Sequence, residues 1–286
     1  MGESDCCGLA LVLRSYRNEV EINVVTNAFG DLGALRSKPI DGIPEALQKK
    51  AGYREHHLQL ESAYSDEELV SIDQYGLAGV NFYNSSRLPP HYDTIPGSIP
   101  ELLLRETVAQ KLQRVNQKLQ SVGLELWVMD AWRPIEVQDY THDVWMPNFL
   151  KSIKHFSSDE EMWREVEQYS AKGSNDGQID PLSPPPHSTG AAVDLTIRWI
   201  GQDHLYMGSI FDDFTSRANT DFYETNIMDH SFSDYEARNN RRLLYWMMSN
   251  EGFSNNPTEW WHFSWGDQMW ARLQGEPSAL YSCLKP

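Results

Sequence analysis

The most constraining feature of this sequence is a segment that places two polar side chains around small residues at the entrance to an apolar run. It reads HSTGAAVD and begins at His187 and ends at Asp194. Gly190 permits a turn after the histidine, and the residues 191–197 alternate as expected for a strand. Asp194 then lies on the face opposite to the alternate residues that enter a core, namely Val193, Leu195 and Ile197.

A second segment downstream completes a candidate metal site. Catalytic zinc takes three ligands from His, Asp, Glu or Cys and keeps a fourth position for water. His187, Asp194 and His262 supply such a set and predict one Zn²⁺ per chain. Glu259 stands three residues before His262, close enough in the chain to exchange a proton with that water as general base and then acid. Residues three apart in a regular strand point to opposite faces, so we expect Glu259 just outside the strand, after Pro257.

The two segments resemble the zinc D-alanyl-D-alanine dipeptidases, the family that includes the vancomycin-resistance dipeptidases. The family signature is Ser-x-His-x-x-Gly-x-Ala-x-Asp, followed later by Glu-x-x-Trp-His. Pro185 replaces the signature serine here, which leaves room for a preference for another dipeptide. The remaining signature positions match: His187, Gly190, Ala192, Asp194, Glu259, Trp261 and His262.

Further segments share this resemblance and imply roles for three more residues. Asp130 to Pro134 is similar to the family's Asp-Gly-Tyr-Arg-Pro, which implies that Arg133 stabilises the oxyanion of the transition state, as a fixed guanidinium can. The alternative for Arg133 is an ordinary surface ion pair, for example with Asp130 or Glu136. The segment that ends at Asp212 resembles the one whose aspartate binds the substrate ammonium, although such an aspartate can also merely cap a turn.

The family also has an early segment with a substrate-binding tyrosine. The stretch 70–84 corresponds to it, with Tyr75 as the nearest candidate. The resemblance covers roughly the C-terminal three quarters of the chain.

The resemblance implies hydrolysis of a small dipeptide with a free amino terminus, most simply D-Ala-D-Ala, and a small dipeptide as the partner. A D,D- or L,D-carboxypeptidase acting on cell-wall peptides would share the metal and the base. Two histidines and a carboxylate also describe the facial triad of non-haem Fe(II) oxygenases, and His91-Tyr92-Asp93 has a similar compact form. A binding protein that keeps the metal but has lost catalysis is the remaining alternative.

Charge and cysteine content limit the partners and the compartment. The net charge of −17 over 286 residues repels phosphate backbones and anionic lipids, so we expect no nucleic-acid or membrane partner. The three cysteines lie near the termini, which favours a reducing compartment. We expect neither a secretory signal nor a membrane span at the amino terminus, and therefore a cytoplasmic enzyme. The oligomeric state stays open.

The expected fold is α+β, with a central antiparallel or mixed sheet that carries the metal ligands and is flanked by helices. Residues 66–286 form the catalytic domain, and 1–65 are an N-terminal extension that acts as a cap, a dimer contact or a loose appendage. Periodicity and caps predict the following elements: strands over 9–13, 21–25, 124–129 and 259–264; helices over 44–50, 99–119, 134–145, 158–169 and 233–252.

Overall fold

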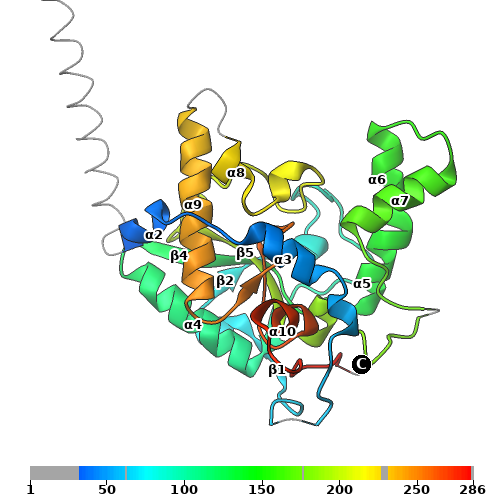
Figure 1. Ribbon diagram of the computed structural model, residues 1–286, viewed down its shortest axis with the longest axis horizontal. Helices are drawn as coiled ribbons and strands as arrows, with labels where there is room; N and C mark the ends of the chain where they lie inside the picture. The colour runs from blue at the N-terminus through cyan, green and yellow to red at the C-terminus, as the bar shows by residue number, and fades with distance from the viewer. Residues whose placement is uncertain (1–31, 62, 176, 227–230, 285–286) are drawn as a thin grey trace, which may run out of the picture.

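A five-stranded mixed sheet lies at the centre of the protein (Figure 1), in a computed structural model that describes residues 32–61, 63–175, 177–226 and 231–284. Its strands, in spatial order, are β2 (Ala78–Gly79), β4 (Leu124–Asp130), β5 (Ala192–Trp199), β7 (His262–Ser264) and β6 (Ser254–Asn255). β2 runs parallel to β4 and the other neighbours are antiparallel, so the expected α+β class with a central sheet is confirmed and the sheet is mixed. A separate two-stranded sheet pairs β1 (Leu69–Ser71) with β3 (Leu103–Arg105).

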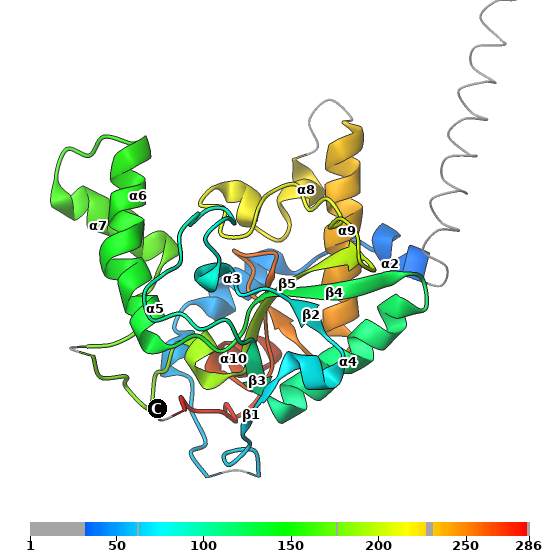
Figure 2. The same ribbon diagram turned by 180° about the vertical axis from the view of Figure 1, so that it is seen from behind.

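Helices surround this sheet. Their bounds are α2 (Gly33–Ser37), α3 (Ile43–Lys50), α4 (Glu106–Gln120), α5 (Ile135–Tyr140), α6 (Met146–Ile153), α7 (Asp159–Tyr169), α8 (Phe222–Thr225), α9 (Phe232–Ser249) and α10 (Gln268–Gln274). A π-helical turn (Thr141–Trp145) joins α5 to α6, and short 3₁₀ turns include η2 (Tyr53–Glu55) and η6 (Pro186–Thr189). α5, α6 and α7 form an arm that projects from the body of the protein (Figure 2).

The two faces of the central sheet differ in chemistry because β4 and β5 pair in a fixed register. Leu126 stands opposite Ile197 and Val128 opposite Leu195, so these apolar side chains share one face. α4 and α9 contact each other on this side, and their buried residues join the same core. The expected division of β5 between a core face and a face that carries Asp194 is therefore confirmed.

The second face of the sheet is polar but is also buried. Asp194 is only 2% exposed, and the segment 204–211, which lies beside Met129 and Thr196, contributes Leu205, Met207 and Phe211 to the core. A register shift between Val128 and Asp130 sets Asp130 directly opposite Asp194. The sheet thus presents two adjacent buried carboxylates at one end.

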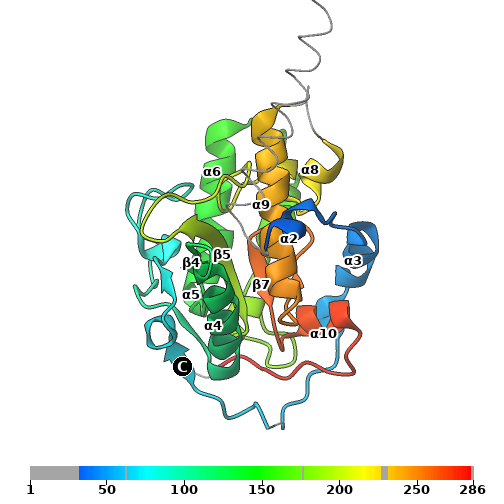
Figure 3. The same cartoon turned by 90° about the vertical axis from the view of Figure 1, so that its left-hand side faces the viewer.

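The described part of the N-terminal segment is packed onto the catalytic body. α2 contacts α9, where Arg36 forms an ion pair of 2.6 Å with Glu236, and α3 lies beside α10 (Figure 3). The helix expected over 44–50 is confirmed. The strands expected over 9–13 and 21–25 lie outside the described residues.

Most expected elements are present, with shifted ends. β4, β5 and α7 agree with the sequence to within two residues, and Ser158 caps α7 as expected. The helix expected from 99 was wrong at its start, because residues 103–105 pair with β1 and the helix begins at Glu106. The helix after Arg133 was too short, since helical turns continue to Ile153. The strand expected over 259–264 is formed only by its last three residues, 262–264.

Candidate metal centre

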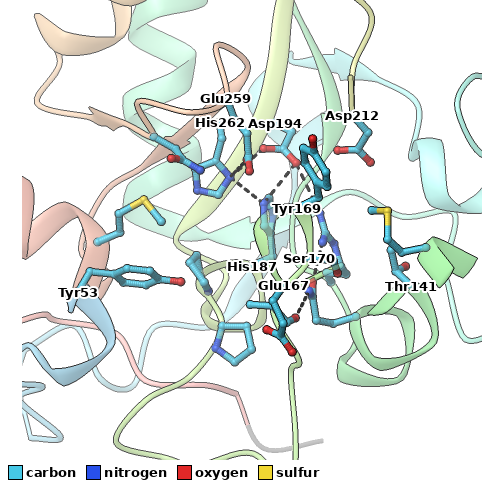
Figure 4. Close-up of a pocket in the computed structure, with 18 of the residues that line it drawn as sticks. Tyr53, Thr141, Glu167, Tyr169, Ser170, His187, Asp194, Asp212, Glu259 and His262 are labelled. Atoms are coloured by element: carbon cyan, nitrogen blue, oxygen red, sulfur yellow. Dashed lines mark hydrogen bonds and ion pairs between the residues drawn. The ribbon is translucent and has the colours of Figure 1, made fainter. Parts of the chain in front are cut away.

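Three side chains from separate elements converge at the polar end of the sheet (Figure 4). His187 comes from η6, Asp194 from β5 and His262 from β7. Their ligand atoms all lie within 4.8 Å of one another, and all three residues are buried. The structure therefore brings together the set that the sequence singled out for a metal.

Backbone structure fixes the position of each of these residues. Asp194 and His262 stand directly opposite each other in the β5–β7 pair. The turn that carries His187 ends at Gly190, whose φ of +72° favours glycine and where an added Cβ would come within 2.6 Å of the Leu69 side chain. The spacing between the ligands is thus set by strand pairing and by one tight turn.

The geometry of the cluster fits a tetrahedral ion. Nε2 of His187 lies 3.1 Å from Nδ1 of His262 and 3.3 Å from Oδ2 of Asp194, and Nδ1 of His262 lies 3.0 Å from Oδ1 of Asp194. Ligands at zinc distances of about 2.0–2.1 Å in a tetrahedron are separated by roughly 3.3 Å. The two nitrogens lie at nearly this separation from each other, and each lies at nearly this separation from one oxygen of Asp194, so the three side chains suit one ion and leave a fourth corner open.

The hydrogen bonds around the cluster direct lone pairs inward. Nδ1 of His187 lies 2.8 Å from the carbonyl oxygen of Ala131, so it donates there and Nε2 faces the cluster unprotonated. Oδ2 of Asp130 lies 3.1 Å from the same Nδ1. Oδ1 of Asp194 is buried and accepts no hydrogen bond among the described residues. A buried carboxylate oxygen that lacks a hydrogen-bond donor is suited to bind a metal ion.

Charges within the cluster oppose the effect of burial. Burial alone would raise the pKa of Asp194, but His187 and His262 hold that pKa well below its usual range. Burial alone would lower the pKa of His187, and the Asp194 and Asp130 carboxylates raise it. The carboxylate therefore stays ionised and ready to bind a cation.

Glu259 lies beside the cluster, outside the strand as expected. A turn closed by the His262 N–H, which donates to the Glu259 carbonyl at 3.2 Å, precedes β7. Oε2 of Glu259 is 3.8 Å from Nδ1 of His262, and its side chain is 33% exposed. Glu259 is thus the carboxylate that both borders the ligands and meets the cavity.

Arg133 is a partly buried member of the site. Its Nε and Nη2 donate to Oδ2 of Asp130 at 2.9 and 2.7 Å, and Nη2 lies 3.5 Å from Oδ2 of Asp194. The guanidinium also stacks over the ring of Tyr83 at 4.2 Å. Burial works against its charge, but Asp130, Tyr83 and Asp194 together with Asp212 outweigh this effect and raise the pKa of Arg133. The ion pair with Asp130 that was the alternative role is therefore present, but it does not lie at the surface. It holds a permanent cation beside the ligands.

Asp212 is held at the same cavity by two aromatic donors. The hydroxyl of Tyr83 donates to Oδ2 of Asp212 at 2.9 Å, and Nε2 of His91 lies 3.1 Å from the same oxygen. Burial raises the pKa of Tyr83 well above its ordinary value, which keeps the hydroxyl protonated as a donor. Asp212 has a φ of +52°, an uncommon backbone conformation for a residue other than glycine. Its carboxylate is therefore held in place by the surrounding structure.

Tyr75 is not at the cavity, where a substrate-binding residue would lie, and the His91 segment does not supply metal ligands. The hydroxyl of Tyr75 donates to Glu106 at 3.0 Å, and Tyr75 does not line the cavity around the ligands. Tyr83, which the sequence reasoning missed, occupies that cavity instead. His91 orients Asp212 and is not among the clustered ligands, and its neighbour Asp93 is exposed.

One small cavity of about 290 Å³ is lined by the three clustered ligands together with Glu259, Arg133, Asp212 and Tyr83. This volume lies near the lower end of the usual range for small-molecule sites, so it suits a substrate of few atoms. Its wall combines the ligands with side chains from the N-terminal segment and from the helical arm, among them Lys50, Tyr53, Gln138, Thr141, Glu167 and Tyr169.

Comparison with known proteins agrees with this geometry. The family model described as D-ala-D-ala dipeptidase matches residues 98–276. This chain belongs to the D-Ala-D-Ala dipeptidase family. Family membership makes it an enzyme and a metallopeptidase. The family match begins well after α3, so Lys50 and Tyr53 lie ahead of it.

Curated relatives carry the same description. A D-alanyl-D-alanine dipeptidase of Synechocystis sp. is 33% identical over 213 residues, which cover 68% of this chain and 83% of that protein. One from Escherichia coli is 27% identical over 165 residues, 56% of this chain and 65% of that protein. One from Enterococcus faecium is 37% identical over 83 residues, 29% of this chain and 37% of that protein. Within the described residues, no helix is long and apolar enough to cross a membrane.

Proposed function

We propose that this metallopeptidase is a zinc enzyme that hydrolyses a dipeptide with a free amino terminus, D-Ala-D-Ala or a close analogue. The observation that carries this proposal is the convergence of His187, Asp194 and His262 beside Glu259 in one small cavity. Two imidazoles and one carboxylate are a ligand set of catalytic zinc sites, and the open fourth corner leaves space for water.

Zinc bound to these residues would supply Lewis acidity and a water of lowered pKa. Glu259 borders the ligands and is partly exposed to the cavity, so it can accept a proton from the attacking water and return it to the leaving amine. Arg133 is a fixed cation beside Asp194. It favours the transition state because negative charge develops on the carbonyl oxygen only as the reaction proceeds.

Asp212 supports a requirement for a free amino terminus. Oδ2 of Asp212 is occupied by Tyr83 and His91, and no described residue forms a hydrogen bond with Oδ1. An ammonium group that pairs there would form a charge-assisted hydrogen bond. The carbonyl of Pro185, at the position of the family serine, already accepts from the backbone N–H and hydroxyl of Ser188. Asp212 is therefore the acceptor better placed for the ammonium.

A dipeptide panel with product identification by mass spectrometry tests the proposal on zinc-loaded protein. Free D-Ala-D-Ala, its N-acetyl form and the L,D and L,L isomers should be compared. We expect the free amine to be preferred, because acetylation removes the charge and leaves the Asp212 carboxylate unpaired. Preference for the acetylated substrate would instead identify a carboxypeptidase.

The same ligand set leaves the non-haem iron oxygenases as the alternative to a hydrolase. Metal analysis of the purified protein, together with measurement of dioxygen consumption, separates the two classes. Bound iron with oxygen uptake coupled to substrate turnover would contradict the proposal. A metal-retaining binding protein would bind dipeptides without cleaving any of them.

Replacing Arg133 with Lys should lower kcat by about 10²- to 10³-fold, which is the usual cost of losing one oxyanion donor. Lysine keeps a charge but loses the planar fork that bonds Asp130 at two nitrogens. Steady-state kinetics on D-Ala-D-Ala checks this. The matched control is Arg198→Lys, because Arg198 also pairs with a carboxylate of β4, Glu125, and stacks on an aromatic ring. Equal losses in both variants would contradict a specific role for Arg133.

Replacing Asp130 with Asn should weaken zinc binding by about 10- to 100-fold, as is typical for groups that support a metal ligand. Asp130 is fully buried and its Oδ2 lies 3.1 Å from Nδ1 of His187, so its charge makes the imidazole a stronger ligand. Competition with a fluorescent zinc chelator measures this. Glu125→Gln removes another buried carboxylate from the same strand and should leave zinc affinity unchanged. A zinc affinity unaltered in Asp130→Asn would refute the supporting role.

A further inference from the structure

The cavity carries opposite charges on its two sides. Figure 4 shows Asp212 on one side of the ligand cluster and Tyr53 on the other, with the Tyr53 hydroxyl directed toward the cavity. Lys50 and Arg54 lie near Tyr53 in the chain and also line the cavity. Lys50 and Tyr53 interact electrostatically with Glu259, whereas Asp212 interacts with Arg133 and Tyr83. The ligand cluster therefore separates an acidic side from a basic side.

Lys50 is the lysine that lines this side of the cavity, and its ammonium has a hydroxyl as its hydrogen-bond partner. Its Nζ donates to the neutral hydroxyl of Thr258 at 2.8 Å, and it forms no ion pair with any residue that the structure describes. Arg54, by contrast, is tied to the carbonyl oxygens of Lys172 and Ser183 at 3.4 and 3.0 Å. Burial lowers the pKa of Lys50, and the charge of Glu259 partly restores it. A partly buried ammonium with only a hydroxyl partner gains most from an anionic ligand.

Contacts with α10 hold the N-terminal segment, and with it Lys50, in position. α3 and η2 both contact α10. The side-chain amide of Gln268 in α10 donates to the carbonyl oxygens of Arg54 and His56 at 3.0 and 2.6 Å. The partner of Lys50, Thr258, directly precedes Glu259 in the chain. The ammonium is thus fixed close to the catalytic carboxylate, on the side away from Asp212.

We propose that Lys50 binds the C-terminal carboxylate of the dipeptide, with the Tyr53 hydroxyl as a second donor. This inference rests on the proposed function and names the second end of its substrate. Asp212 would take the ammonium, the ligand cluster would face the peptide bond between the two ends, and Lys50 would take the carboxylate. Because both termini are then paired with fixed charges, the cavity admits dipeptides and rejects longer peptides at either end.

The alternative role for Lys50 is that its charge affects catalysis only by changing the protonation of Glu259. The two roles predict different results for a substrate without a terminal carboxylate. D-Ala-D-Ala and D-alanyl-D-alaninamide differ only at that group. A lysine that binds the carboxylate affects only the acid, whereas a lysine that tunes Glu259 affects both substrates equally and shifts the pH profile of kcat.

The experiment compares Lys50→Met, Lys50→Arg and Lys49→Met with the unaltered protein on both substrates. We expect Lys50→Met to raise KM for D-Ala-D-Ala by about 10- to 100-fold, the cost of one hydrogen bond to a charged group. KM for the amide should be unchanged, and Lys50→Arg should recover much of the loss. Lys49→Met is the matched control, because Lys49 is the preceding residue of α3, donates to the carbonyl oxygen of Leu273 and is not among the residues that line the cavity. Equal effects of Lys50→Met on both substrates, or equal KM values for acid and amide in the unaltered protein, would overturn the inference.

A binding measurement separates this inference from the proposed function. Calorimetry on the zinc-loaded Glu259→Gln protein gives Kd for the acid and the amide without turnover. If the unaltered protein cleaves neither compound but the calorimetric preference for the acid disappears with Lys50→Met, the proposed function is wrong and the carboxylate site stands. If acid and amide bind equally, or neither binds, the carboxylate site is refuted whatever the protein hydrolyses.

Discussion

Removing the metal with a chelator should reduce dipeptide hydrolysis to the uncatalysed rate, a loss on the order of 10⁶-fold or more given the usual rate enhancements of enzymes. The expectation follows from the site, because Ser264, whose hydroxyl lies 3.3 Å from Nε2 of His262, is fully buried and is not among the residues that line the cavity. One equivalent of Zn²⁺ per chain should restore the rate. Stopped assays with and without chelator, followed by metal titration, measure both effects.

A ligand variant gives the same test without a chelator. His262→Gln should lose stoichiometric zinc and nearly all activity, because a neutral amide of similar size is a poor substitute for an imidazole ligand. His204→Gln is the control, since His204 is exposed, lies beside the ring of Trp127 and does not belong to the ligand cluster. Full hydrolysis by metal-free protein, or an active His262→Gln protein without zinc, would show that the cluster is not the catalytic metal site.

Replacing Glu259 with Gln should lower kcat by about 10²- to 10⁴-fold, the usual contribution of a general acid or base. Glutamine keeps the size of the side chain but cannot accept the proton of the attacking water. Zinc content should be unchanged, because Oε2 of Glu259 is 3.8 Å from the nearest ligand nitrogen and lies outside the clustered set. Steady-state kinetics and metal analysis on the same preparation check both statements.

The control for Glu259→Gln is Glu251→Gln, a glutamate whose carboxylate pairs with Lys118 and Arg114 on the surface. This variant should keep full activity. If Glu259→Gln retained the rate of the unaltered protein, another group would have to move the proton. If it lost zinc instead, Glu259 would be a ligand and not a base.

Each half of the metal cluster was predictable because local sequence rules determine its geometry, whereas the pairing of β5 with β7 that joins the halves is a tertiary contact. Gly190 marks the turn after His187, and the alternation along β5 places Asp194 on the polar face. The three-residue spacing between Glu259 and His262 excludes a common strand face, so the turn before β7 could be expected. In each case the structure depends on residues fewer than about ten positions apart.

Residues brought together by tertiary contacts were not predictable in the same way. Asp212 is held by Tyr83 and His91, which lie 129 and 121 positions away, and no local pattern encodes those contacts. Tyr75 was selected because it falls near the expected place in the chain, yet its hydroxyl donates to Glu106. Tyr83 lines the cavity instead. The helix expected from 99 failed for a related reason, since pairing with β1 decides the structure of 103–105. The role of the N-terminal segment likewise depends on its contacts with α9 and α10.

The position of Asp194 opposite His262 in a single strand pair has a further consequence. The strand pairing that joins β5 to β7 also orders these two ligand side chains. The conformational entropy that their ordering costs is therefore lost during folding and not when the metal binds. An arriving ion therefore meets a preorganised template and spends little of its affinity on rearranging the protein. Metal binding would stabilise the native state, and this stabilisation would increase with the concentration of free metal.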